Sequence, residues 1–202
     1  LIIAFVVSFV LTMIFGDVVV PSASKLKKQI KKVEFKDQEI VSPLEGAVVE
    51  LKDVDDPVFS AGTIGKGVAI NPTNNEVRAP FDGTVVSVFP TQHAIGLKSE
   101  NGVELLIHLG INTVNLKGKY FESKVKDGQK IKKGDLLETF DVKQIKKAGY
   151  DTVVPVVVTN SNNFDDILVE KKNGDQVKFG DQLLMATVDQ VAQKNSVAIA
   201  NA

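Results

Sequence analysis

The fold is decided by residues 79–110, which read APFDGTVVSVFPTQHAIGLKSENGVELLIHLG. Short runs of Val, Ile and Leu alternate here with Gly, Pro, Asn and Asp, and residues 39–51 have the same texture. Such alternation is typical of all-β sandwiches and barrels, so we predict an all-β, antiparallel β-sandwich or barrel. Long helical periodicity is absent outside residues 142–148. Residues 153–159 are a candidate buried strand, in which Pro155 favours a sheet edge or a bulge.

Two internal pseudo-repeats refine this prediction. Residues 43–49 (PLEGAVV) recur 37 positions later as residues 80–86 (PFDGTVV). Residues 128–135 (GQKIKKGD) recur 46 positions later as residues 174–181 (GDQVKFGD), and an apolar run follows both copies. Two Gly around a short run, followed by Asp, are typical of a turn–strand–turn unit. Two copies of each element indicate a quasi-symmetric sandwich, similar to a barrel-sandwich hybrid, rather than a solenoid.

The first residues of the chain differ in composition from the rest. Residues 1–16 carry no charge, and their only polar side chains are Ser8 and Thr12. Sixteen helical residues span about 24 Å, which is less than the roughly 30 Å hydrocarbon core of a membrane. We therefore interpret residues 1–20 as the end of a transmembrane helix, with a buried soluble helix or strand as the alternative.

A basic segment follows the apolar start. Residues 25–32 (KLKKQIKK) contain five Lys, and Lys close behind a transmembrane segment favours the cytoplasmic side. Residues 21–37 are thus predicted to be a basic cytoplasmic linker, either solvated or lying on the lipid surface. The predicted folded domain is residues 38–190, and residues 191–202 are predicted to be a flexible tail. We expect the protein at the cell membrane, with the chain from about residue 21 onward in the cytoplasm.

The composition excludes several functional classes. The 202 residues include 24 basic and 25 acidic side chains and are 44% hydrophobic, which is enough for a sizeable core. A net charge of −1 argues against a nucleic-acid-binding protein. The absence of Cys excludes disulfides, cysteine nucleophiles and thiolate metal sites in this chain. Two His leave little for an all-protein zinc site, and the chain has neither a phosphate loop nor a G-x-S-x-G motif.

The two histidines flank a predicted hairpin. If Glu100-Asn101 is a two-residue loop, His93 directly opposes His108. If Asn101-Gly102 is the loop, His108 opposes Ile95 and His93 is its diagonal neighbour on the same face. Both registers place the imidazoles side by side, whereas a three-residue loop is expected to place them on opposite faces.

A pair of imidazoles permits three kinds of chemistry. One ring can be a nucleophile toward phosphorus while the other donates a hydrogen bond to the phosphoryl oxygens. Both can bind a metal ion with a third ligand from elsewhere, or they can relay protons. Thr91 offers a hydroxyl near His93, and Gly110 leaves the approach to His108 open. The residues alone leave these alternatives open.

Five stretches resemble the glucose-type enzyme IIA domain of the bacterial sugar phosphotransferase system. They are residues 42–46 (SPLEG), 56–59 (DPVF), 65–72 (GKGVAINP), 89–96 (FPTQHAIG) and 101–118 (NGVELLIHLGINTVNLKG). The resemblance extends over residues 40–188. The apolar start is similar to the end of an enzyme IIC permease domain. This order resembles the IIB–IIC–IIA permeases of the β-glucoside, sucrose and trehalose group, which implies that the chain is a C-terminal fragment of such a permease.

The resemblance implies a role for each site residue in a phosphotransferase. His108 matches the histidine that accepts a phosphoryl group from the phosphocarrier protein HPr and passes it to a cysteine of a IIB domain outside this chain. His93 matches the companion that stabilises the phosphate, and Thr91 the threonine that orients a site histidine. The family's apolar docking face matches Phe59, Phe89, Leu106 and Val114. No cofactor is implied, and no metal beyond an optional zinc ion at the two histidines.

One departure and three alternatives complete the sequence interpretation. The family often has an acid four residues after the active histidine, where this chain has Asn112.

A related regulatory domain, fused to a cation-coupled sugar transporter, would be phosphorylated at the same histidine without passing the group to sugar. A swinging-arm carrier would need a modified Lys at a hairpin tip, and Ser99–Gly102 has none. A zinc hydrolase is disfavoured because the chain has only two His.

Overall fold

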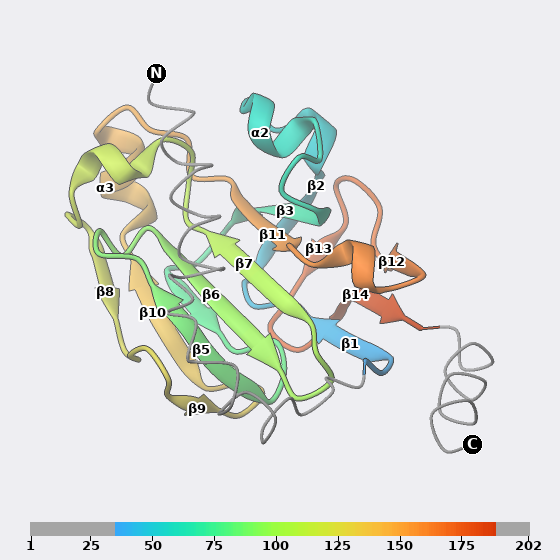
Figure 1. Ribbon diagram of the computed structural model, residues 1–202. Helices are drawn as coiled ribbons and strands as arrows, with labels where there is room; N and C mark the ends of the chain where they lie inside the picture. Colours follow the sequence, from blue (N-terminus) through green and yellow to red (C-terminus); the bar gives the residue numbers. More distant parts are fainter. Residues whose placement is uncertain (1–34, 189–202) are drawn as a thin grey trace, which may run out of the picture. The chain divides into compact units, whose positions relative to one another are not determined.

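The computed structural model of the chain describes residues 35–188 (Figure 1). The predictions for residues 1–20 and 191–202, and for all but the end of the linker 21–37, fall outside the described residues. Within residues 35–188, no helix combines the length and the apolar character that a membrane crossing requires.

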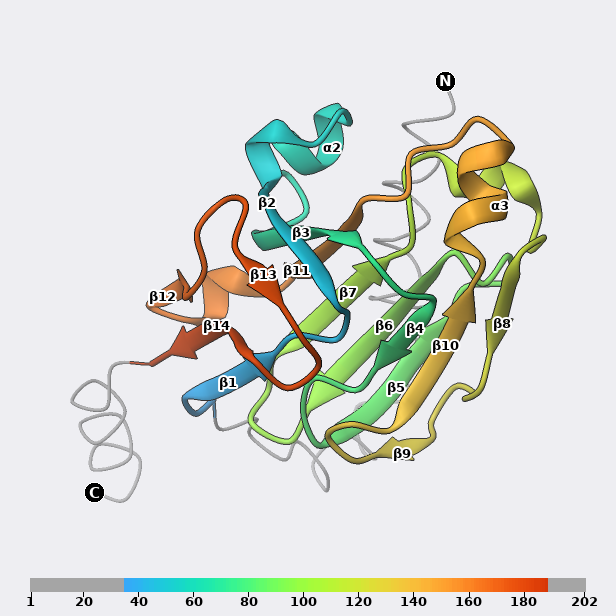
Figure 2. The same ribbon diagram turned by 180° about the vertical axis from the view of Figure 1, so that it is seen from behind.

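The largest sheet has eight antiparallel strands, and β13 and β9 form its two ends (Figures 1 and 2). In spatial order the strands are β13 (Gln176–Val177), β2 (Gly46–Glu50), β3 (Lys66–Pro72), β11 (Val154–Val158), β7 (Glu104–His108), β6 (Ala94–Ser99), β5 (Gly83–Val88) and β9 (Lys130–Ile131).

Two three-stranded antiparallel sheets accompany the large one, and short helices lie in the connections. The small sheets are β1 (Gln38–Val41), β14 (Gln182–Thr187) and β12 (Asp166–Val169), and β4 (Glu76–Arg78), β10 (Leu136–Phe140) and β8 (Phe121–Ser123). The helices are η2 (Leu51–Asp53), α2 (Pro57–Ser60), η3 (Thr113–Leu116), α3 (Val142–Lys147) and η4 (Ser161–Asn163). The predicted antiparallel β-sandwich is confirmed, and α3 occupies the one stretch with predicted helical periodicity.

The repeats seen in the sequence become a quasi-twofold arrangement. Gly46 of β2 pairs with Val177 of β13, and Gly83 of β5 pairs with Ile131 of β9. Gly83 lies 37 positions after Gly46, and Ile131 lies 46 positions before Val177, so the two pairings join equivalent residues of the repeats. The halves β13–β2–β3–β11 and β9–β5–β6–β7 therefore correspond strand by strand, and β1–β14–β12 corresponds to β4–β10–β8.

Close backbone contacts explain why glycine recurs at the start of β2 and β5. A Cβ on Gly46 would lie 2.1 Å from Asn71 O, and a Cβ on Gly83 would lie 2.2 Å from Lys98 O. Both distances are far below van der Waals contact, and the obstructing atoms belong to the backbone of the neighbouring strand. The repeated glycines thus allow the two hairpins to pair closely.

The core joins the large sheet and both small sheets. Buried side chains of all three sheets form one continuous hydrophobic cluster, among them Ile40, Val77, Ile107 and Leu184. Such a cluster is what the predicted sandwich requires, because each sheet buries one face against another.

Strand β11 corrects one expectation. Pro155 was expected at an edge or bulge, but it lies in a central strand in which all five residues are buried. Pro155 pairs with Ala69 of β3, while the ladder with β7 begins only at Val156 opposite Ile107. Proline has no N–H to donate. This is tolerated because the pairing with β7 ends at Val156 and Ile107, so Pro155 need not donate a hydrogen bond to β7 at the level of His108.

The first described residues are fastened to the tip of the β6–β7 hairpin. Lys36 N donates to Asn101 O (3.2 Å), and Asn101 Nδ2 donates to Asp37 O (3.1 Å). The ring of Phe35 packs edge to face on Phe164 at 5.4 Å. Lys36 and Asp37 therefore bind the hairpin at the end that carries its loop.

Candidate active site

Both histidines lie at the other end of this hairpin. His108 is the last residue of β7, and His93 immediately precedes β6. Their ring centroids are 4.9 Å apart in an edge-to-face arrangement, and the two residues are 8% and 4% exposed. The structure therefore brings the entire histidine content of the chain into one buried pair.

The hairpin register differs from both predicted registers. Ser99 N donates to Val103 O at 2.9 Å, which leaves residues 100–102 as a three-residue loop. Both predictions assumed a two-residue loop and are wrong. A loop of three residues, including Gly102 with a φ of 93°, is a common alternative for a hairpin.

The expected consequence of that loop is also wrong. Ala94 opposes His108, so regular strand alternation would place His93 and His108 on opposite faces. His93, however, lies in the turn that connects β5 to β6, outside the regular strand. The preceding residue, Gln92, has a left-handed φ of 52°. Alternation therefore does not extend to His93, and the rings meet in spite of the register.

The hydrogen bond of His108 fixes its tautomer. His108 Nδ1 lies 2.7 Å from Gly110 O. A carbonyl oxygen only accepts, so Nδ1 carries the proton and the neutral ring holds its lone pair on Nε2. Gly110 has a φ of 78°, and a Cβ there would lie 2.6 Å from Asp151 O, so this turn requires glycine. The outcome is a nucleophilic Nε2 held in one orientation.

His93 has its own hydrogen-bond partner. Thr91 Oγ1 lies 2.5 Å from His93 Nδ1, within the same turn. A hydroxyl can donate to a ring nitrogen, and in that case the proton of the neutral ring sits on Nε2. Thr91 and His93 then present one N–H donor beside the lone pair of His108.

Both imidazoles are neutral near pH 7. Burial, with a smaller contribution from the charge of His108, lowers the pKa of His93 to about 3. Burial also lowers the pKa of His108, against the opposing effects of Gly110 O and the Asp56 carboxylate. An unprotonated ring is the form that can attack an electrophile.

Two phenylalanines pack on the histidine pair. The Phe59 ring lies 5.2 Å from the His108 ring, and the Phe89 ring 5.5 Å from the His93 ring, both edge to face. Phe59 belongs to α2, whose N-cap Asp56 accepts from Val58 N and Phe59 N at 2.8 and 3.2 Å. Asp56 therefore both positions Phe59 and places a negative charge near His108.

The residues predicted as a docking face are not alike in exposure. Phe59, Phe89 and Leu106 are 5%, 5% and 2% exposed, so little of their surface is available to a partner. Leu106 precedes His108 by two residues on the same face of β7. Val114 is half-buried in η3, the helix that follows the histidine loop.

Asn112 occupies the N-cap position of η3 and has a left-handed backbone conformation. It is exposed and has a φ of 58° at the start of η3. Asn adopts the left-handed region more readily than most residues with a side chain. The structure thus accounts for Asn112 by backbone geometry.

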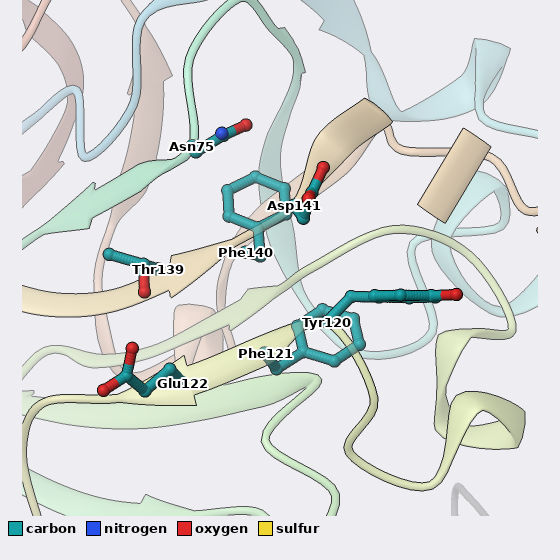
Figure 3. A pocket seen from close by; sticks show the side chains of 7 residues that line it. All are labelled: Asn75, Tyr120, Phe121, Glu122, Thr139, Phe140 and Asp141. Carbon is teal, nitrogen blue, oxygen red and sulfur yellow. The ribbon is translucent and has the colours of Figure 1, made fainter. Parts of the chain in front are cut away.

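A hollow of about 330 Å³ lies on β8 and β10, and neither histidine lines it (Figure 3). It is lined by Asn75, Tyr120, Phe121, Glu122, Thr139, Phe140 and Asp141. Within residues 35–188, no three His, Asp or Glu side chains lie together as a metal site would need. The histidine pair is therefore the only cluster in this part of the chain for which we find a chemical role.

Asp56 and Gln92 are the site residues that the sequence analysis did not identify. Asp56 precedes Pro57 at the start of α2, and an Asp-Pro dipeptide is a recognisable helix start. A four-residue helix has too little periodicity to support that signal. For Gln92, no sequence signal indicates a left-handed conformation.

Comparison with known proteins relates this chain to one family. The family described as phosphoenolpyruvate-dependent sugar phosphotransferase system, EIIA 1, matches residues 38–164. The solved structure of glucose permease IIA from Mycoplasma capricolum is 37% identical, with a TM-score of 0.67, and the match covers 74% of this chain and 96% of that one.

Curated relatives give the same grouping. A protein named PTS system beta-glucoside-specific EIIBCA component, from Halalkalibacterium halodurans, is 43% identical over 150 residues, or 74% of this chain and 23% of the relative. The protein of the same name from Bacillus subtilis is 50% identical over 125 residues, or 62% of this chain and 20% of the relative. The chain thus matches between a fifth and a quarter of the length of these relatives.

Proposed function

Since the match covers residues 38–164, the chain belongs to the EIIA 1 family of the phosphoenolpyruvate-dependent sugar phosphotransferase system, and on this premise we propose that His108 is its phosphoryl acceptor. Members of this family are phosphotransferases that carry a phosphoryl group during sugar uptake. The observation that carries the assignment is the pair of buried neutral imidazoles 4.9 Å apart, with the lone pair of His108 on Nε2.

In the first proposed step, the phosphorylated carrier HPr presents its phosphohistidine to His108. The Nε2 lone pair attacks phosphorus as the donor's N–P bond breaks, and the donor nitrogen keeps that electron pair. His108 retains the proton on Nδ1 in its bond to Gly110 O. The phosphorylated ring is positively polarised, and both Gly110 O and the Asp56 carboxylate favour that charge.

His93 and Thr91 act on the bound phosphoryl group in this scheme. Thr91 donates to His93 Nδ1, which leaves the N–H on Nε2 of His93 as a donor to a phosphoryl oxygen. The donor is in place before the group arrives, so the transfer requires little reorganisation. His93 is therefore proposed as the phosphate stabiliser and Thr91 as the residue that orients it.

In the second proposed step, a cysteine thiolate of a IIB domain attacks the phosphorus. An S–P bond forms, the Nε2–P bond breaks, and the electron pair returns to Nε2, so His108 regains its starting form. The cycle uses no nucleotide and no metal ion. Zinc bound by the two imidazoles would be a separate, optional state that needs further ligands from a partner.

The same face serves both partners in this scheme. Phe59 and Phe89 pack on the histidine rings, Leu106 lies on the strand that ends at His108, and Val114 lies in the helix that follows it. A partner that covers such a face excludes water, which would otherwise hydrolyse the phosphohistidine. We propose that HPr and the IIB domain dock over these four residues, and that direct contact falls mainly on the half-buried Val114, because the other three are nearly buried.

The relatives suggest the permease to which the domain belongs. Their names join EIIB, EIIC and EIIA in one protein and specify β-glucosides. We propose that this chain is the EIIA part of such a permease at the cell membrane. Residues 1–20 are then the end of a membrane helix, and residues from 21 onward are cytoplasmic, where HPr is available. This arrangement favours a permease over a regulatory domain fused to a cation-coupled transporter.

The test is phosphorylation of the chain by phosphoenolpyruvate, enzyme I and HPr, followed by intact mass and acid-lability measurements. We expect one acid-labile phosphoryl group on the wild type, none on His108→Ala, and one on His93→Ala at a lower rate. A folded wild-type chain that takes up no phosphoryl group would refute the proposal. Loss of growth on a β-glucoside in a permease carrying His108→Ala would test the substrate class.

A further inference from the structure

The turn between β5 and β6, residues 89–93, orients the His93 side chain toward the face opposite to the one that strand alternation predicts. The ladder continues one step beyond β6, because Leu109 N donates to His93 O at 2.7 Å. Ile95 and Leu97 of β6 point into the core, and alternation would send His93 the same way. The ring instead meets His108, which is on the other face. Some feature of the turn must therefore redirect the His93 side chain.

Gln92 redirects the backbone. Its φ of 52° lies in the left-handed region, which is unfavourable for a residue with a Cβ. Gln92 N donates to Phe89 O (2.7 Å), and Phe89 N donates to Ala94 O (3.1 Å), so two hydrogen bonds close the turn around it. The residue before His93 is thus where the chain leaves the strand pattern.

The side chain of Gln92 fastens the turn to a different sheet. Gln92 Oε1 accepts from Ser123 N at 2.7 Å. Ser123 belongs to β8, which pairs with β10 in a three-stranded sheet. The turn is therefore held by the large sheet through Leu109 and by a small sheet through Gln92. Two attachments in different sheets leave the turn little freedom to rotate His93 away.

We propose that Gln92 is a positioning residue, whose left-handed backbone and amide clamp on β8 keep His93 facing His108 during phosphoryl transfer. The inference rests on the proposed function of the histidine pair, and it adds a residue that acts through His93 without touching the phosphoryl group. Positioning errors of about 1 Å can reduce a rate roughly a hundredfold, so a clamp on a catalytic turn has measurable consequences.

Three variants separate the two parts of this inference. Gln92→Ala removes the amide and keeps the Cβ, whereas Gln92→Gly removes the amide but favours the left-handed backbone. Gln129→Ala is the matched control, because Gln129 Oε1 also accepts a backbone N–H, from Lys126 at 3.3 Å, in an exposed turn. Each variant is assayed for its rate of phosphorylation by phospho-HPr and, by NMR titration, for the pKa of the His93 ring.

We expect Gln92→Ala and Gln92→Gly to lose roughly tenfold or more in rate. The pKa of His93 should rise from about 3 toward its ordinary value of 6.5, because the released ring gains access to water. Gln129→Ala should match the wild type in both measurements. A role in folding alone would change the melting temperature without moving the His93 titration of the folded protein.

Several results would overturn the inference. It fails if both Gln92 variants keep the wild-type rate and the wild-type His93 titration. Wild-type behaviour of Gln92→Gly alone would refute the amide clamp. If Gln92→Ala does not fold, Gln92→Asn, with an amide one carbon shorter, provides the same comparison. Absence of phosphorylation in the wild type would refute the proposed function instead, and the titration would still decide whether Gln92 positions His93.

Discussion

The two quasi-symmetric halves of the domain share one frame, but only one half carries the histidines. Gly83 pairs with Ser99 in one half, and Gly46 pairs with Pro72 in the other. These matched pairings align β6 with β3. The strand that follows in each half, β7 or β11, pairs with β6 or β3 and can be aligned in the same way.

The alignment assigns a counterpart to each histidine. Ala94 pairs with His108, and the equivalent Gly67 pairs with Val157, so Val157 is the counterpart of His108. Lys66 is in turn the counterpart of His93. Val157 is 1% exposed and apolar, and Lys66 is bound at the surface to an Asp166 carboxylate 2.9 Å away. The same frame thus holds the histidine pair in one half and, at the counterpart positions, a buried Val and a surface ion pair in the other.

The connections between strands account for the difference. The β5–β6 connection is short and contains His93, whereas the β2–β3 connection, residues 51–65, contains η2 and α2 (Figure 2). Phe59 of α2 packs on His108, so the half without histidines provides part of their cover. The comparison teaches that both halves share one frame of strands, and that the histidine pair arises from a His in place of Val157 on the strand together with unequal connections.

The strongest test of the comparison is to change the two counterparts His93 and Lys66. We expect His93→Ala to slow phosphorylation of His108 by roughly a hundred- to a thousandfold, because one preorganised donor to the developing charge is lost. Lys66→Ala should stay within about twofold, since exposed ion pairs contribute little. Rapid-quench kinetics with phospho-HPr measures both. Equal losses in the two variants would contradict the assignment of chemistry to one half.

The second test concerns a buried carboxyl that breaks the symmetry of the core. Glu138 opposes Val77, and its counterpart Leu184 opposes Ile40. Glu138 is fully buried, and neither carboxyl oxygen has a hydrogen-bond partner among residues 35–188. Burial raises the pKa of Glu138 to about 8, from 4.5 in an unfolded chain. Between these values the folded chain retains a proton that the unfolded chain has released, so stability falls as the pH rises through this window.

Glu138→Leu restores the symmetry and should stabilise the domain. At pH 7 the wild type should have lost on the order of 3 kcal/mol relative to pH 4.5, and the variant should not show this loss. Urea unfolding of both proteins at pH 5 and pH 7.5 provides the comparison. If the difference in free energy of unfolding between the two proteins does not widen with pH, the Glu138 carboxyl is in contact with water or with a hydrogen-bond partner.

The third test asks whether equivalent substitutions in the two halves change the free energy of unfolding by equal amounts. Gly46→Ala and Gly83→Ala would each drive a Cβ into a backbone oxygen at nearly the same distance. We expect both to destabilise the domain by about 1–3 kcal/mol, the usual cost of overpacking. Chemical denaturation measures the free energy of unfolding of each variant. If only one variant loses stability, the two hairpins are not equivalent.

The smallest expected effect is in the two repeated turns. Asp135 Oδ2 accepts from Lys132 N at 2.8 Å, and Asp181 Oδ2 accepts from Lys178 N at 2.9 Å. Replacing either Asp with Ala should cost about 1 kcal/mol, because one exposed hydrogen bond is lost. Thermal unfolding should show similar decreases for the two variants. A much larger decrease in one of them would indicate an additional role for that turn.

The repeats could be predicted from the sequence because the frame constrains particular residue types. Gly46 and Gly83 have no space for a side chain, and the turns before Asp135 and Asp181 place Gly at positive φ. These local requirements leave a visible pattern of identical residues. The sandwich and its internal symmetry therefore followed from sequence alone.

The site was predictable only in part. The two histidines and Thr91 were expected in one place because they flank one hairpin, but the loop SENG permits several registers. The final proximity depends on Gln92 leaving the strand pattern, which no periodicity reveals. Glu138 was equally hidden, because an irregularity between Leu136 and Glu138 buries two successive residues of β10 and breaks the alternation.

The attachment of residues 35–37 to Asn101 has a consequence for the order in which partners visit the site. Lys36 and Asp37 bind Asn101 at one end of the β6–β7 hairpin, and the histidines lie at the other end. Residues 35–37 thus contact the loop end of the hairpin, and Phe59 and Phe89 pack on the two rings at its histidine end. In the proposed function, donor and acceptor both reach His108 at this end of the hairpin, so occupancy by one excludes the other, and an excess of unphosphorylated donor should inhibit the onward transfer.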